Sequence, residues 1–154
     1  MIQRIQTLYL LAAAALLAVT IFTPIAVFAA NGTELTLSAF SFADATNESV
    51  QSTLWLGIVL VLSALLPLLI IFLFKHRQLQ IRLCGVELVL LLGDVAFIVI
   101  YYMLSARAVE GFEFAASSLR LGAVMPLVAI VLVAMAMRAI FRDELLVRSL
   151  DRIR

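Results

Sequence analysis

Residues 83–104 read LCGVELVLLLGDVAFIVIYYML, an apolar stretch that carries only two charged side chains, Glu87 and Asp94. A helix needs about 20 apolar residues to cross the hydrocarbon core of a bilayer. Three further stretches meet this condition, at about residues 8–28, 54–74 and 119–137. The sequence therefore predicts one all-α membrane domain over residues 1–154, with four transmembrane helices in an antiparallel bundle.

The composition excludes most other classes of protein. Of the 154 residues, 65% are hydrophobic and 14% are charged, whereas about a quarter of a soluble domain is charged. A soluble fold of this size has too little interior to hide so many apolar side chains. This excludes a soluble enzyme and a disordered tail. The formal net charge of +1 provides no global field for nucleic acid, so we expect the lipid bilayer, and no nucleic acid, as a partner.

The residues that usually carry catalysis or bind metals are scarce. The chain has one cysteine, Cys84, and one histidine, His76. A single cysteine excludes dithiol chemistry within the chain, and a single histidine excludes bis-histidine haem ligation and a histidine-rich zinc site. Glycine-rich phosphate loops and hydrolase motifs are missing as well. We therefore expect no metal, no cofactor, no catalytic residue and no enzymatic activity.

Basic residues predict the orientation of the bundle. Arg4, the inner loop at 75–82 and the tail at 138–154 together hold nine basic residues, whereas the opposite side has only Arg107 and Arg120. Short cytoplasmic segments of membrane proteins carry an excess of Lys and Arg. Both termini are therefore expected in the cytoplasm, and the loops at 29–53 and 105–118 on the other side.

The first apolar stretch has two interpretations. Arg4 followed by an apolar run and a small-residue sequence before Ala30 is typical of a signal peptide. The apolar region of a signal peptide usually has about 7–15 residues, whereas residues 8–28 provide 21 positions. We therefore favour a retained helix, with cleavage before Ala30 as the alternative.

The first outer loop contains a hairpin pattern. Asn31-Gly32 favours a tight turn, and the next residues, Thr33 to Leu37, alternate polar and apolar as strands do. We expect a short β-hairpin here, with the end of the first span extending into it. Residues 112–114 alternate in the same way and can add a strand. The alternative is an irregular loop.

Prolines and glycines are expected to shape the helices. Pro24, Pro67 and Pro126 are each predicted to lie inside a span, where a proline can kink the helix or act as a hinge. Gly85 and Gly93 flank the two acidic residues of the third span and permit close approach of another backbone.

The tail has the pattern of an amphipathic helix. Glu144 and Arg148 are four residues apart and can pair along a helix. We expect this helix to continue, or bend, from the fourth span along the inner membrane surface. It either anchors the span by its charges or provides a docking site for a partner, in which case the contact residues are Arg142, Glu144, Arg148, Asp151 and Arg152.

The third span carries the residues that a function must explain. A charge at the centre of a bilayer costs about 2.5–3.5 kcal/mol on insertion scales. Asp94 lies seven residues after Glu87, and Tyr101 lies seven residues after Asp94. Seven residues almost complete two helical turns, so the three side chains share one face. We expect this face to point into the bundle.

Three interpretations of the two carboxyl groups remain open. In the first they hold helices together, Glu87 with Arg82 or Arg138, and Asp94 with Ser63 or Thr20. In the second they form a proton or cation relay. In the third Asp94 pairs with a basic residue of another subunit.

Three segments resemble a known family. They are MIQRIQTLYLL at residues 1–11, KHRQLQIRLC at 75–84 and RDELLVRSLDRIR at 142–154. Together they resemble the small four-helix membrane proteins of Bacteroidota designated domain of unknown function 4293. The resemblance covers essentially the whole chain and implies a bacterial inner-membrane protein with a periplasmic loop. It transfers no catalytic residue.

Two functions follow from these observations. The chain is expected to be a non-enzymatic accessory or scaffold subunit of a membrane complex, with a membrane protein or a second copy as its partner. The alternative is a small oligomeric transporter or proton-coupled channel that uses Glu87 and Asp94, as small multidrug exporters use an intramembrane carboxylate.

Overall fold

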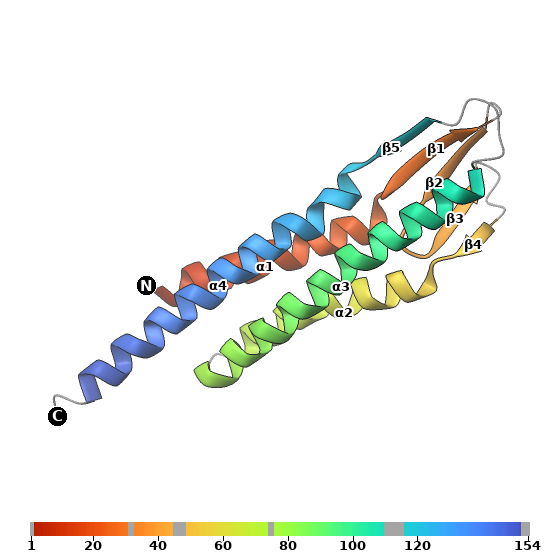
Figure 1. Cartoon of the computed structure of the whole chain (residues 1–154). Coiled ribbons are helices and arrows are strands. Elements are labelled where there is room, and N and C mark those ends of the chain that lie inside the picture. The colour runs from red at the N-terminus through yellow and green to blue at the C-terminus, as the bar shows by residue number, and fades with distance from the viewer. Residues whose placement is uncertain (1, 31–32, 45–48, 74–75, 110–115, 152–154) are drawn as a thin grey trace.

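Four long helices and a small sheet form the protein. The computed structural model describes residues 2–30, 33–44, 49–73, 76–109 and 116–151. The helices are α1 (Ile2–Phe22), α2 (Leu54–Phe72), α3 (Arg77–Val109) and α4 (Leu121–Asp151). All four are long and apolar enough to cross a membrane, as the sequence predicts (Figure 1).

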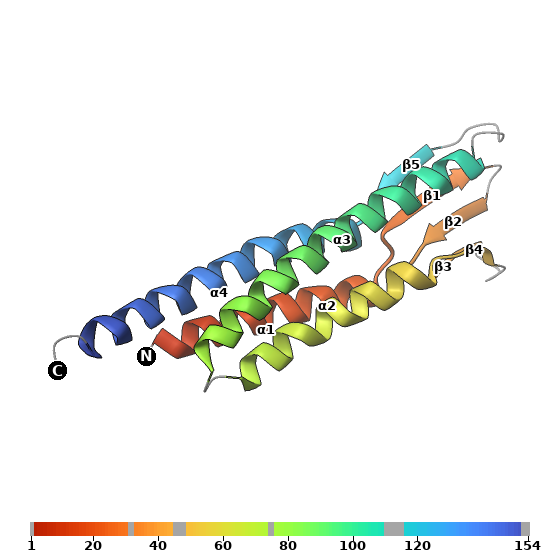
Figure 2. The ribbon, with the colours of Figure 1, turned by 60° about the horizontal axis from the view of Figure 1, so that its bottom comes forward.

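The helices form an antiparallel bundle in which each helix has two main neighbours. α1 packs against α4 and α2, and α3 packs against the same two helices. α1 begins and α4 ends at the same end of the bundle, which we call the terminal end (Figure 2). The sheet lies at the other end, the sheet end (Figure 1).

A seven-residue repeat of buried positions explains why the helices pack lengthwise. On each helix the buried residues are spaced alternately by four and three, which is the pattern of knobs-into-holes packing between helices that cross at a small angle. On α3 half-buried Tyr101 fills the place between Ile98 and Ser105. The buried positions of the repeat are Gln6, Leu10, Ala13, Leu17 and Thr20 on α1; Leu56, Leu60, Ser63, Pro67 and Ile70 on α2; Gln80, Cys84, Glu87, Leu91, Asp94, Ile98 and Ser105 on α3; and Gly122, Pro126, Ala129, Val133, Ala136 and Ile140 on α4. Ala14, Gly57 and Val109 are buried in addition to these.

The sheet is larger than the predicted hairpin. Its five antiparallel strands have the order β4-β3-β2-β1-β5. The predicted hairpin is confirmed, because Ala30 pairs with Thr33 across the turn, although Asn31-Gly32 itself lies outside the described residues. Residues 112–114 also lie outside them, and the strand of that loop follows at 116–119. The strands are β1 (Ala26–Ala30), β2 (Thr33–Leu37), β3 (Ser41–Asp44), β4 (Ser49–Ser52) and β5 (Ala116–Leu119).

The predicted end of the first span, and with it the helical position of Pro24, is wrong. α1 ends at Phe22, because a residue that precedes proline is disfavoured in the helical conformation. The next residues form a strand whose apolar side chains are buried, and the Ile25 amide donates a hydrogen bond to the Leu37 carbonyl at 2.8 Å. Hydropathy alone does not distinguish a buried strand from a continuing helix.

The upper part of α3 holds the sheet against the bundle. The Phe28 ring on β1 lies 5.7 Å from the Phe42 ring and 5.3 Å from the Tyr102 ring, measured between centroids. The Tyr102 hydroxyl donates a hydrogen bond to the Ser117 hydroxyl on β5 at 3.0 Å. α3 therefore extends beyond its predicted end at residue 104 because its last turns pack on the sheet.

The fourth helix is also longer than its predicted span. It runs without interruption to Asp151, so the predicted tail helix continues directly from the span (Figure 1). Pro67 and Pro126 lie inside α2 and α4, as predicted.

An added methyl group should have opposite effects at Gly122 and at Gly93. A Cβ at Gly122 would lie 2.8 Å from the Pro24 carbonyl oxygen, whereas a Cβ at Gly93 would meet no atom within 4 Å. The same holds for Gly85, so the predicted close backbone approach at Gly85 and Gly93 is wrong. Gly122→Ala should lower the free energy of unfolding in detergent by about 1–3 kcal/mol, because backbone must move.

Gly93→Ala is the matched control and should leave that free energy unchanged or raise it, since alanine is the better helix former. Equal stability of the two variants would contradict the close contact between α4 and the end of α1.

Candidate functional site: a polar column inside the bundle

Polar side chains recur at every seventh position along α3. Gln80, Glu87, Asp94 and Tyr101 follow one line of the helix. Glu87 and Asp94 have an exposed fraction of 0%, and Gln80 one of 7%. Tyr101 is half-buried and stacks on Phe97, with ring centroids 6.4 Å apart. We call these four residues the polar column, and the structure places it on the bundle side of α3.

Three contacts fix which residues of the other helices lie at the same level. The Gln80 side-chain amide donates a hydrogen bond to the Ile70 carbonyl on α2 at 2.9 Å. Arg77 at the start of α3 pairs with Asp143 on α4 at 3.0 Å. Gly122 at the start of α4 packs on Pro24, just after α1. Because neighbouring helices are antiparallel and rise equally per residue, these contacts set the register of the whole bundle.

The register places hydroxyl groups near the two carboxyl groups. Seven residues from the Gln80–Ile70 contact, Glu87 reaches the level of Ser63. The Arg77–Asp143 pair places Asp94 level with residue 126 on α4. The Gly122–Pro24 contact in turn places residue 126 level with Thr20 on α1. The Ser63 hydroxyl also lies near Asp94.

Neither carboxyl group has a hydrogen-bond partner among the described residues. All four carboxyl oxygens of Glu87 and Asp94 are buried and unpartnered. The Ser63 hydroxyl donates instead to the Val59 carbonyl at 3.0 Å. The Thr20 hydroxyl donates to the Leu16 carbonyl at 3.1 Å. The structure thus brings Asp94 and Ser63 together without forming the predicted bond.

The predicted ion pairs of Glu87 are not formed. Arg82 and Arg138 are both exposed. Arg82 lies two residues from Gln80, and Arg138 lies two residues from Ile140. Two residues turn a helix by about 200°, so both arginines point away from the buried seam. The column therefore contains acidic groups without basic partners in the part of the chain that the structure describes.

Sequence reasoning missed three polar groups of the interior. Gln80 lies seven residues before Glu87, and Gln6 lies seven residues before buried Ala13. The Gln6 side-chain nitrogen and the Ser105 hydroxyl oxygen are buried and, like the carboxyl groups, have no hydrogen-bond partner among the residues that the structure describes. Extending the seven-residue spacing of Glu87 and Asp94 by one more step would have identified Gln80.

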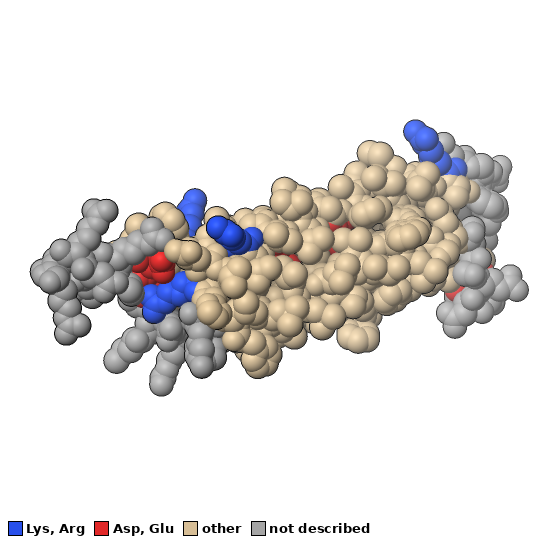
Figure 3. All heavy atoms as spheres, turned by 90° about the horizontal axis from the view of Figure 1, so that it is seen from below, with Lys and Arg blue, Asp and Glu red and all other residues tan. Residues whose placement is uncertain are grey.

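The candidate contact residues of the tail lie only partly within the described chain. Arg142 is exposed, Glu144 is half-buried, and Leu145 and Leu146 are 50% and 54% exposed. The side chains of Arg148, Asp151 and Arg152 lie outside the described residues. On the face seen in Figure 3, the charged residues gather toward the two ends, and the surface between them is almost entirely uncharged.

The carboxyl groups of this site can carry protons or bind cations weakly. Among the described residues, no group of three or more His, Cys, Asp or Glu side chains could hold a metal ion. Cys84 is buried one turn from Glu87 and is a free thiol.

The comparison with protein families gives a match. A family model described as "Domain of unknown function (DUF4293)" matches residues 2–153, nearly the whole chain. This confirms the resemblance to that family. No curated protein matches the chain.

The unpartnered carboxyl groups predict that apolar replacements stabilise the bundle. A buried polar group without a partner costs about 1–3 kcal/mol. Glu87→Met and Asp94→Leu should therefore each raise the free energy of unfolding in detergent. Gln80→Met is the matched control, and it should lower this free energy by about 0.5–1.5 kcal/mol because it removes a formed hydrogen bond. Destabilisation by Glu87→Met as large as that by Gln80→Met would show that Glu87 has a partner.

Proposed function

The chain belongs to the DUF4293 family, and we propose that it is a non-enzymatic accessory or scaffold subunit of a membrane complex. Four helices that are long and apolar enough to cross a membrane support its place in a bilayer. The partner is another membrane protein or a second copy of the chain.

The proposed location is the bacterial inner membrane, with both termini in the cytoplasm. α1 begins and α4 ends at the same end of the bundle (Figure 2). Most arginines of the chain fall in segments of this end, and excess positive charge favours the cytoplasmic side. The sheet would then lie in the periplasm.

The projecting end of α4 carries the proposal of a partner. Arg77, where α3 begins, pairs with Asp143, so residues 144–151 continue beyond the start of α3 (Figures 1 and 2). Eight residues of helix extend about 12 Å. Leu145 and Leu146 lie at its base and are half-exposed. Exposed apolar side chains on a projecting, charged helix are typical of an interaction surface.

Site-specific crosslinking in the native membrane tests this role. A photoreactive amino acid at Leu145 should form one dominant protein adduct, which mass spectrometry identifies. The matched control is the same amino acid at Val131, which is 57% exposed within the apolar part of α4, and it should react mainly with lipid. Identical adducts from both positions, or no protein adduct from Leu145, would overturn the proposal.

A transport function is the second candidate, and the buried carboxyl groups of Glu87 and Asp94 favour it. Acidic residues inside a bundle are a frequent feature of proton pathways. Neither residue, however, lines the four grooves that described residues form at the terminal end. The accessory role therefore remains the first proposal.

Flux measurements separate the two candidates. If the chain is an accessory subunit, liposomes that contain the purified protein should show the proton permeability of empty liposomes. A proton-coupled channel would raise this permeability, and both Asp94→Asn and Glu87→Gln would abolish the increase. Thr23→Ala, which removes a hydroxyl bonded to the Val19 carbonyl outside the polar column, is the control and should not alter the flux. Permeability that depends on the carboxyl groups would replace the accessory role by transport.

A further inference from the structure

Two arginines of α4 form a ridge between two grooves. Arg138 and Arg142 are four residues apart, so they lie one turn apart on one face of the helix. Both are exposed. Both line a groove between α1 and α4, together with Tyr9 and Met135, and both line a second groove between α3 and α4.

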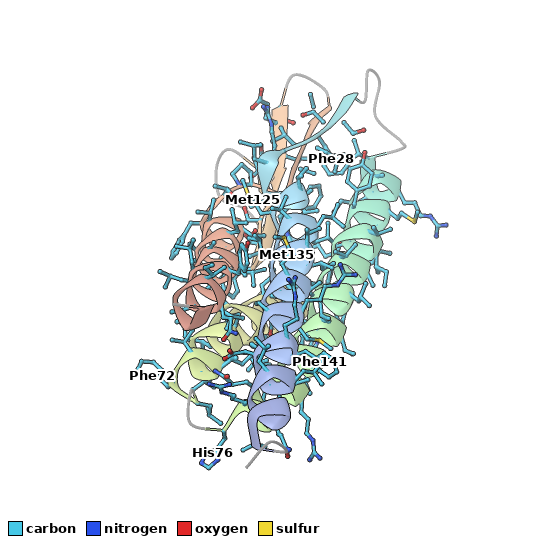
Figure 4. All side chains as sticks on the ribbon, turned by 90° about the vertical axis from the view of Figure 1, so that its left-hand side faces the viewer. Phe28, Phe72, His76, Met125, Met135 and Phe141 are labelled. Carbon is cyan, nitrogen blue, oxygen red and sulfur yellow. The ribbon has the colours of Figure 1, made fainter. Side chains whose placement is uncertain are left out.

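The groove between α3 and α4 is apolar except for the two arginines. Its other lining residues are Leu88 on α3 and Ala134, Met137 and Phe141 on α4, and its volume is about 500 Å³. Figure 4 shows the terminal half of α4 with Met135 and Phe141 labelled. On α4 the lining residues of the groove run from residue 134 to residue 142, so the groove follows about two turns of the helix.

The ridge carries positive charge without an acidic partner in the described chain. Arg138 and Arg142 form no hydrogen bond or ion pair with any described residue. Asp143, which lines the α1–α4 groove, is held by Arg77 at 3.0 Å. Glu144 lines different grooves, near Arg82 and His76, and has an interaction of its own. An anion at the ridge would therefore meet two free guanidinium groups.

The depth of the ridge matches the edge of a bilayer. Arg138 lies 17 residues after Leu121, where α4 begins, which corresponds to about 26 Å of helix. The hydrocarbon core is about 30 Å thick. If the apolar part of α4 spans this core, the two guanidinium groups lie at the level of the lipid phosphates and the groove opens toward the acyl chains.

We propose that Arg138 and Arg142 bind the phosphate of an anionic glycerophospholipid, with one of its acyl chains lying in the groove between α3 and α4. Guanidinium groups bind phosphate oxygens through paired hydrogen bonds. Basic pockets between transmembrane helices are known to hold anionic headgroups. This site is independent of the proposed accessory role, because it requires only that the bundle sits in a bilayer.

Native mass spectrometry of the full chain, released from detergent with added lipid, tests the site. Phosphatidylglycerol should bind more tightly than phosphatidylcholine with the same acyl chains. An arginine near an anionic surface contributes about 1 kcal/mol, so Arg138→Gln with Arg142→Gln should weaken phosphatidylglycerol binding about 30-fold. Arg138→Lys with Arg142→Lys keeps both charges but loses the paired hydrogen bonds, so it should weaken binding less than the glutamine pair does.

The matched control removes two exposed arginines from the opposite end. Arg107→Gln with Arg120→Gln changes the net charge equally but leaves the ridge intact, so the lipid preference should persist. Ala134→Phe fills the groove while both arginines remain in the chain, and it should reduce binding of long-chain phosphatidylglycerol. Melting curves of each variant in detergent confirm that the fold is retained.

Three outcomes would overturn the site. An equal loss of preference in the Arg107/Arg120 control would show a general charge effect. Unchanged binding in the Ala134→Phe variant would show that no acyl chain occupies the groove. Displacement of the lipid by millimolar inorganic phosphate would show that the ridge recognises a soluble anion instead of a lipid.

Discussion

The seven-residue repeat of buried positions is the constraint on which the rest of the structure depends. All four helices bury residues spaced alternately by four and three, and this spacing holds neighbouring helices nearly parallel along their whole length. Because all four helices rise equally per residue, residues that are the same number of positions from a contact between two helices lie at the same depth in the bundle. Residues that lie seven positions apart on one helix therefore share the buried face. Gln80, Glu87 and Asp94 are polar residues at such positions on α3.

The same repeat separates the polar residues of the protein into two systems. Glu87 and Asp94 occupy positions of the buried seam and have no partner among the described residues. Arg138 and Arg142 lie on the opposite side of the repeat and are exposed at the terminal end. The buried acidic groups are therefore kept apart from these two arginines. Glu87 and Asp94 face the inside of the bundle, whereas Arg138 and Arg142 face the surroundings of the protein.

The sequence predicted the parts of the fold that depend on apolar length. Four helices follow from four apolar stretches, and the inward face of α3 follows from Glu87, Asp94 and Tyr101. The end of the first span was predicted wrongly, because residues 26–28 are as apolar in β1 as they would be in a helix, and a proline such as Pro24 does not by itself end a transmembrane helix. The absence of an ion pair at Glu87 could not be predicted either. Arg82 and Arg138 have the right charge and lie at a suitable depth, but the direction of their side chains depends on the register of all four helices.

Oxygen accessibility of spin labels along α3 tests the central claim most directly. A nitroxide is placed at each position from 84 to 98 in turn, in the protein reconstituted into lipid bilayers. The repeat predicts minima of collision with dissolved oxygen at 84, 87, 91, 94 and 98, and maxima at exposed positions such as 89 and 92. Maxima at 87 and 94, or accessibility without this period, would contradict a bundle built around the buried acidic face of α3.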